Sequence, residues 1–153
     1  MFLENKFLLK NINDKSYILV NCIKSKISLD YENLGSQLYT FLKSNKIEDS
    51  FLSSNSSNLT NVQMEKFLHG AQLKSYNFSM YKTEKINKQI INLHVVGDKF
   101  KKTNSLRNKL NSLLEGVFLT RDLVSEPGNV LHPDEYARRI IKLRKYGLKV
   151  TVY

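Results

Sequence analysis

Segments typical of β-strands alternate with segments typical of α-helices along this chain of 153 residues. Because each type of segment has its own spacing of apolar residues, the alternation limits the folds that are open to the chain. It predicts an α/β fold with a three-layer core. Residues 1–15 lack a clear period, and we expect them to be irregular. Strands are expected, the first of them buried, at residues 16–23, 49–53, 89–96 and 148–153.

Apolar residues recur at helical spacing in two segments of the first half of the chain. Asp30 can cap the first of these helices, and Thr60 or Asn61 can cap the second. If Thr60 is the cap, Gln63 stands three residues later and predicts a capping box. Serine and asparagine dominate residues 53–61, which predicts a loop between the helices. The apolar faces that we expect in the core are Leu34, Leu38, Phe41 and Leu42, and Met64, Phe67, Leu68 and Ala71.

A long third helix and a shorter fourth helix are expected in the second half of the chain. The third opens at Thr103, and Glu-Pro-Gly-Asn at 126–129 breaks the chain, because a residue before proline avoids the helical region and glycine permits a tight turn. Pro133 fits the first turn of the fourth helix, where it loses no hydrogen bond, and Gly147 is placed to end that helix. The apolar stripe of the third helix is Leu106, Leu110, Leu113, Leu114, Val117 and Phe118.

The chain is strongly basic, with a formal net charge of +10, and 15 of its 24 lysines and arginines lie in residues 76–153. Such an asymmetry can mark a face that binds anions, including nucleic acid. The alternative is that an AT-rich coding sequence supplies many lysine codons. We favour this second interpretation, because no aromatic and basic platform or zinc module accompanies the charge.

Several classes of protein are excluded by composition. The single cysteine, Cys22, cannot form an internal disulfide, which argues against a secreted, disulfide-stapled scaffold. The longest apolar stretches are about five residues, whereas a membrane span needs roughly 20. The first residues do not resemble a signal peptide. We therefore expect a cytoplasmic protein without a membrane interaction.

The candidate residues for chemistry do not form a known motif. His69, His94 and His132 lack the close spacing of metal ligands, so none is assigned to a metal. His94 is expected to be half-buried in its strand, and His132 to cap the fourth helix weakly. Cys22 is expected in a strand core without an adjacent base, which leaves little support for nucleophilic catalysis.

Two acidic residues at the start of the fourth helix, Asp134 and Glu135, have a structural interpretation, because carboxylates there stabilise the helix dipole. Gly-x-Ser-x-Gly, Gly-x-Gly-x-x-Gly and P-loop patterns are absent from the sequence. The residues alone therefore assign no catalytic, cofactor-binding or metal-binding position.

Two stretches resemble the leucyl aminopeptidase (cytosol aminopeptidase) family. The segment 121–133 is similar to the pattern Arg-Asp-Leu-x-Asn-Glu-Pro-x-Asn-x-x-Thr-Pro, with Ser125 and His132 in place of the usual Asn and Thr. The segment 67–83 is similar to Gly-Ala-x-Leu-x-Ser-Tyr-x-Phe-x-x-Tyr-Lys. The matching positions of the first segment are Arg121, Asp122, Leu123, Glu126, Pro127, Asn129 and Pro133.

The resemblance implies a domain organisation. Residues 1–100 would form a macro-like α/β amino-terminal domain, shortened by about one β-α-β unit. Residues 101–125 would form a linker helix, and residues 126–153 the incomplete beginning of the catalytic domain, with its first helix and strand.

The resemblance also implies a function for the intact family enzyme: removal of amino-terminal residues from peptides, with two divalent metal ions (Mn or Zn), in a homo-oligomer that is a hexamer in the family. Some bacterial members also bind DNA. The metal-binding and catalytic motifs of the family have no match in this sequence, so the chain alone is expected to be inactive. Two alternatives stay open: a basic module that binds nucleic acid or a nucleotide, and a decayed paralogue that packs into aminopeptidase oligomers.

Overall fold

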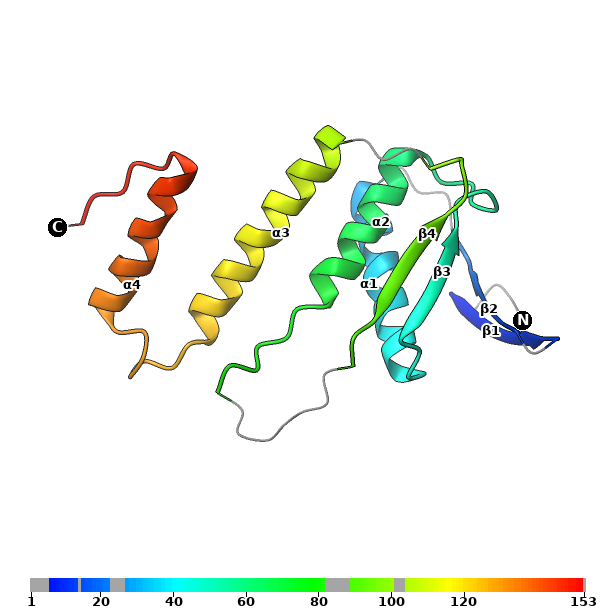
Figure 1. The fold of residues 1–153 in the computed structure, drawn as a ribbon, viewed down its shortest axis with the longest axis horizontal. Coiled ribbons are helices and arrows are strands. Elements are labelled where there is room, and N and C mark those ends of the chain that lie inside the picture. Colours follow the sequence, from blue (N-terminus) through cyan, green and yellow to red (C-terminus); the bar gives the residue numbers. More distant parts are fainter. Residues whose placement is uncertain (1–5, 14, 23–26, 82–88, 101–103, 153) are drawn as a thin grey trace. The chain divides into compact units, whose positions relative to one another are not determined.

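The computed structural model describes residues 6–13, 15–22, 27–81, 89–100 and 104–152. The chain divides into two compact units, Met1–Leu114 and Glu115–Tyr153. Among the described residues, the first unit contains two strand pairs and two helices, and the third helix runs through the boundary (Figure 1). The predicted α/β class is confirmed.

The chain begins with an antiparallel hairpin of β1 (Phe7–Ile12) and β2 (Lys15–Val20). Phe7 pairs with Val20 at its open end, and Asn13 has a positive φ of 46° at the turn, a conformation that asparagine tolerates. The prediction of irregular structure was therefore wrong for β1. The predicted buried strand does form in part, but most of β2 is exposed, and the end of that prediction lies outside the described residues.

Helices α1 (Ser28–Ser44) and α2 (Asn61–Lys74) follow, and their N-termini are capped differently. In α2 the predicted capping box is confirmed: the backbone N–H of Gln63 donates to Thr60 Oγ1 at 3.3 Å, and the backbone N–H of Thr60 donates to Gln63 Oε1 at 2.9 Å. In α1 the N-cap is Ile27, without a side-chain hydrogen bond, and Asp30 lies in the first turn. The expected Asp30 cap was wrong because the helix starts earlier.

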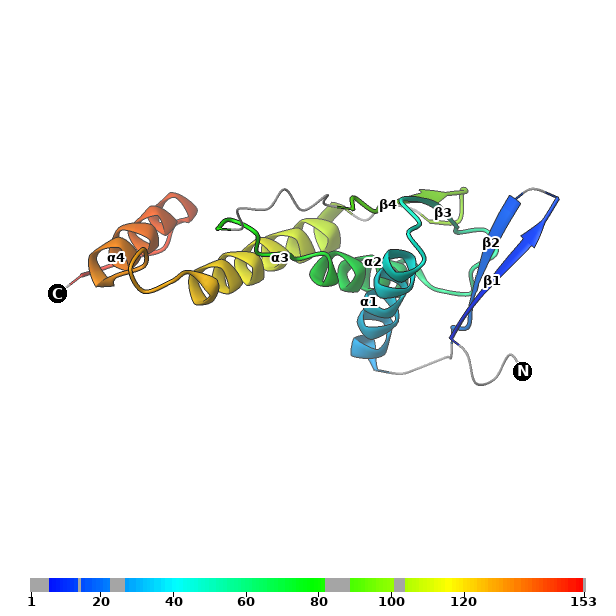
Figure 2. The same cartoon turned by 90° about the horizontal axis from the view of Figure 1, so that it is seen from below.

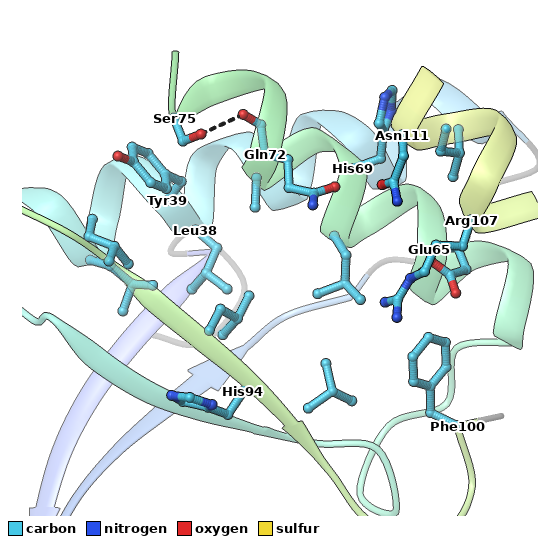
Figure 3. Close-up of a pocket in the computed structure, with 17 residues that line it drawn as sticks. Leu38, Tyr39, Glu65, His69, Gln72, Ser75, His94, Phe100, Arg107 and Asn111 are labelled. Atoms are coloured by element: carbon cyan, nitrogen blue, oxygen red, sulfur yellow. Dashed lines mark hydrogen bonds and ion pairs between the residues drawn. The ribbon is translucent and has the colours of Figure 1, made fainter. Parts of the chain in front are cut away.

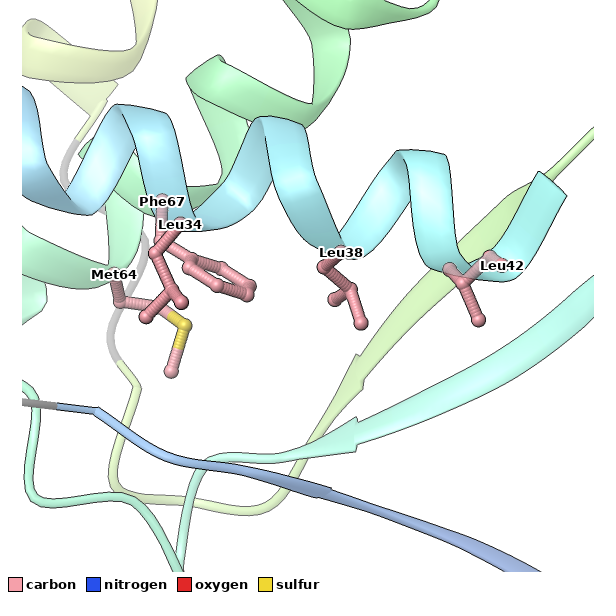
Figure 4. Close-up of a cluster of buried hydrophobic side chains, with 5 residues drawn as sticks. All are labelled: Leu34, Leu38, Leu42, Met64 and Phe67. Carbon is pink, nitrogen blue, oxygen red and sulfur yellow. The ribbon is translucent and has the colours of Figure 1, made fainter. Parts of the chain in front are cut away.

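The hydrophobic core lies on α1 and α2 and consists of Leu34, Leu38, Leu42, Met64 and Phe67 (Figure 4). Burial of these predicted apolar faces is the main stabilising contribution in this unit. The helices approach closely because two glycines lie at their contact. A Cβ atom at Gly35 would lie 1.8 Å from the carbonyl oxygen of Phe67, and one at Gly70 would lie 1.9 Å from that of Glu32.

Strands β3 (Asp49–Ser53) and β4 (Asn92–Val96) form a parallel pair, with Asp49 opposite Asn92. Both were predicted, although β4 begins three residues later than expected. Leu52 and Leu93 pack against the core of α1 and α2, whereas Phe51 is 71% exposed. Helices therefore cover one side of this pair (Figures 1 and 2), which gives two layers in the described residues instead of three.

The second unit contains the end of α3 (Asn104–Ser125), then α4 (Pro133–Ile141) and the short 3-10 helix η1 (Lys142–Tyr146). The expected turn follows α3, Pro133 lies in the first turn of α4, and Gly147, with φ 85°, ends η1. The strand expected after Gly147 was wrong for residues 148–152, which are not in a strand. A strand needs a partner for its backbone groups, and no described strand lies in this unit.

Candidate functional site

Three residues considered for chemistry lie at exposed positions. The side chain of His94 is 52% exposed, close to the half-buried environment that we expected. It stacks on Phe51 and has Nε2 3.7 Å from Asp49 Oδ1. His132 is the N-cap of α4 but makes no side-chain hydrogen bond there, so the expected weak cap does not form. Cys22 is exposed after the end of β2, not within a strand core.

An ion-pair network joins the turn after α3 to α4. Arg139 donates to Glu126 Oε1 at 2.7 Å and to Glu135 Oε1 at 2.8 Å, and Arg138 also donates to Glu135. The hydrogen bonds from Arg138 and Arg139 lower the pKa of Glu135 to about 2. Asp134 and Glu135 lie in the first turn of α4, as predicted. The network fixes the turn to the helix, which is a structural role.

A cavity of about 460 Å³ lies in the first unit, between the helices and β4 (Figure 3). Its wall includes side chains from α1, α2, β4 and the beginning of α3. Pockets of this size bind small molecules in many proteins. The polar residues of the lining are Tyr39, Glu65, His69, Gln72, Ser75, His94, Arg107 and Asn111.

Glu65 and His69, one helical turn apart on α2, are the buried polar residues of this cavity, at 3% and 1% exposed. Glu65 Oε2 lies 3.4 Å from Arg107 Nε, and Figure 3 shows the two side chains next to each other. Nδ1 of His69 lies 3.4 Å from Glu32 Oε1. That contact lacks hydrogen-bond geometry, and Glu65 Oε1 and both ring nitrogens of His69 have no hydrogen bond within the protein.

Sequence reasoning missed this cluster. Glu65 and His69 are spaced like any two residues on one helical face, and both adjoin the apolar stripe of α2. Their position next to the apolar stripe was the sequence signal for their burial. Arg107 lies about forty residues away in sequence, so only the tertiary structure, which places the beginning of α3 at the same cavity as α2, brings it to Glu65.

The described residues contain no group of three or more His, Cys, Asp or Glu side chains that could hold a metal ion. None of the described helices is both long enough and apolar enough to cross a membrane. In the part of the chain that is described, the cavity with Glu65, His69 and Arg107 is the candidate functional site.

Comparison with known proteins relates the chain to one group of peptidases. It is 41% identical over 85 residues to the probable cytosol aminopeptidase of Gluconobacter oxydans, a match that covers 54% of this chain and 17% of the relative. It is 34% identical over 99 residues to that of Phytoplasma mali, covering 61% of this chain and 20% of the relative. No protein-family model matches the chain.

A solved structure of a tomato leucine aminopeptidase mutant has a similar fold, with a TM-score of 0.70 and 19% identity, over 92% of this chain and 29% of that protein. The chain thus has the α/β fold of part of a leucine aminopeptidase. Together with the sequence matches, this relates it to the amino-terminal portion of the cytosol aminopeptidase family. The chain spans about a fifth of the length of the curated relatives that it matches.

Proposed function

We propose that this chain is the amino-terminal portion of a metal-dependent aminopeptidase that removes the first residue from peptides during cytoplasmic protein turnover. In this proposal the chain contributes to folding and assembly, including a homo-oligomer, and residues outside the chain carry out hydrolysis. The observation that supports it is the identity of 34–41% to cytosol aminopeptidases over 85–99 residues.

The second unit gives independent support. Among its described residues only Glu126 is buried, and apolar side chains such as Val124, Tyr136 and Leu148 are exposed. An element with exposed apolar side chains and no apolar core of its own depends on contacts with other protein surface. The remaining part of a longer enzyme would provide that surface.

Two divalent metal ions, Mn or Zn, would activate the attacking water in such an enzyme. Paired metals lie about 3.5–4 Å apart and need several convergent carboxylates. The described acidic residues do not fit, because Glu65, Glu126 and Glu135 each face an arginine and the described residues contain no cluster of three ligands. No metal-dependent step is therefore assigned to these side chains.

The experiment has two arms, with leucine para-nitroanilide as substrate and Mn or Zn in the buffer. The purified chain alone should release no nitroaniline above the buffer rate. The chain co-expressed with the remaining portion of the Phytoplasma mali relative should co-purify with it and give hydrolysis that a chelator abolishes. A chain lacking residues 115–153 is the control, and it should not restore activity.

Either arm can contradict the proposal. Chelator-sensitive hydrolysis by the chain alone would show that the catalytic residues lie within it. Failure of the two portions to associate, with both of them folded, would contradict a shared role in one enzyme.

Binding to nucleic acid stays a prediction from charge. Arg138 and Arg139, in the basic second half, form ion pairs with carboxylates and so are partly neutralised. If the basic half does bind duplex DNA, the affinity should fall steeply as salt rises, because binding would release counterions. Fluorescence anisotropy at two salt concentrations measures this, and a flat signal at low salt would exclude it.

A further inference from the structure

Arg107 provides a partly exposed positive charge on the wall of the cavity. Its side chain is 31% exposed, and its Nε atom faces Oε2 of Glu65 at 3.4 Å. Its terminal nitrogens, Nη1 and Nη2, make no hydrogen bond to any described residue. These two nitrogens lie in one plane, at a spacing that matches the two oxygens of a carboxylate.

Apolar side chains dominate the part of the cavity lining that α1 and β4 provide. They come from both elements and from the segments on either side of β4, and the volume of about 460 Å³ suits a small molecule. A ligand that fits this lining has one anionic end and an apolar body. The apolar lining residues of these elements are Leu38, Leu42, Ile91, Leu93, Val95 and Phe100.

The burial of Glu65 indicates why Arg107 is held in place. A carboxylate that is 3% exposed is costly unless it is paired, and Arg107 is the cation that faces it. Glu65 Oε1 has no hydrogen bond within the protein, so the carboxylate is not part of a fully satisfied structural network. Glu65 thus acts on Arg107 from within the cavity lining, where its Oε2 atom faces Nε and orients the guanidinium.

We propose that this cavity binds a small carboxylate with an apolar body. Arg107 holds the carboxylate through Nη1 and Nη2, and Glu65 is the positioning residue for Arg107. Gln72 and Asn111 line the same cavity and bring side-chain amide donors to it. The inference goes beyond the proposed aminopeptidase role and does not depend on it, because binding is measured on this chain without peptide hydrolysis.

Nuclear magnetic resonance of the nitrogen-labelled chain tests the ligand class. Isocaproate is the probe, and isohexanol and isoamylamine are controls with similar apolar bodies but a neutral or positive end. Isocaproate should shift the amide signals of the cavity lining in a saturable way, and the two controls should bind at least about tenfold more weakly, the effect of losing a charge-assisted hydrogen bond. Equal shifts with isohexanol, or none with millimolar isocaproate, would overturn the proposal.

Variants of the chain test whether Arg107 binds the carboxylate of the ligand. Arg107→Gln should weaken isocaproate binding about tenfold or more. Lys109→Gln removes the same charge from an exposed position on α3 that does not line the cavity, and it should leave the affinity within about twofold. Unchanged affinity in a folded Arg107→Gln chain would overturn the assignment.

Two further variants separate positioning from folding. If Arg107→Gln does not fold, as judged by circular dichroism, Arg107→Lys replaces it; the charge is kept but the planar fork is lost, so binding should still weaken several-fold. Glu65→Gln should reduce the preference for isocaproate over isohexanol. An equal loss of affinity for both ligands would show a structural role for Glu65 alone.

Discussion

The two units of this chain are stabilised in different ways. In Met1–Leu114, α1 and α2 bury a continuous apolar cluster, with Leu42 and Phe67 at 1% exposed. In Glu115–Tyr153, the buried residue among those described is a charged one, Glu126, and its carboxylate pairs with Arg139. The first unit therefore has a core of its own, whereas the second has a polar network and exposed apolar side chains.

This difference has a physical consequence for stability. Burial of apolar surface contributes about 25 cal/mol per Å², and a helix pair that buries several large side chains can offset its loss of conformational entropy. A short helix held by exposed ion pairs gains much less, because solvent screens such pairs. We therefore expect the second unit to be the less stable of the two when the chain is isolated.

The largest expected effect comes from the core of the first unit. Phe67→Ala removes a ring that is 1% exposed and should lower the free energy of unfolding by about 3–5 kcal/mol, through lost burial and the cavity left behind. Val124→Ala, at a position 81% exposed in the second unit, is the matched control and should change it by less than about 0.5 kcal/mol. Urea unfolding followed by circular dichroism measures both, and equal effects would contradict the comparison.

A second prediction concerns the replacement of glycine by alanine, which should lower the stability at Gly70 in the first unit and raise it at Gly116 in the second. Gly70→Ala places a Cβ atom 1.9 Å from the backbone carbonyl oxygen of Glu32 and should destabilise the first unit by about 1–3 kcal/mol, because α1 and α2 must separate. Gly116→Ala meets nothing within 4 Å and should stabilise α3 by about 0.5–1 kcal/mol. Thermal unfolding of both variants measures the difference, and a loss of stability in Gly116→Ala would show a contact at that face of α3.

A third prediction tests the polar network of the second unit. Glu126→Gln removes the carboxylate that Arg139 contacts at 2.7 Å and should destabilise the local turn by about 1–3 kcal/mol. The amides of Val130 and Leu131, which donate to the carbonyl oxygen of Pro127, should then exchange hydrogen faster. Unchanged exchange rates would indicate that the turn holds its conformation without the ion pair.

The smallest expected effect is the loss of stability at acidic pH. The pKa of Glu135 is lowered to about 2, below its ordinary value of 4.5, by hydrogen bonds from Arg138 and Arg139. The stabilising contribution of this carboxylate is therefore present above pH 4.5 and is lost as the pH falls through about 2. A carbon-detected titration of the Glu135 carboxyl group measures the pKa. In the Arg138→Gln variant the pKa of Glu135 should rise toward 4.5. An unchanged pKa would mean that Arg139 alone keeps it low.

Local signals in the sequence predicted many of the elements. The Thr60 and Gln63 capping box, Pro133 in the first turn of α4 and the turn after α3 all form as expected. Each depends on hydrogen bonds or backbone angles within about four residues, so the sequence carries the complete signal. The hairpin strand β1 was missed because its residues show no regular alternation of polar and apolar side chains.

The candidate site could not be predicted in the same way. Glu65 and Arg107 meet only because the fold brings the beginning of α3 to the cavity that α2 lines, and nothing in the spacing of either residue signals that contact. The exposure of His94 and the two-layer arrangement also depend on which face of β3 and β4 receives the helices. Alternation along a strand separates its two faces, but here the exposed face carries both the apolar Phe51 and the polar His94, so the signals of the two strands conflict.

The sequence by itself determined where α2 and α4 begin, where the chain turns and which faces of α1 and α2 enter the core, together with the resemblance to cytosol aminopeptidases. The tertiary structure alone decided which charged side chains are buried, how closely Gly35 and Gly70 bring α1 and α2 together, and where a cavity lies. The physical reason is the sequence separation between the residues that interact. Backbone preferences and caps act between near neighbours, whereas burial is a property of residues that are distant in sequence and meet only in the folded chain.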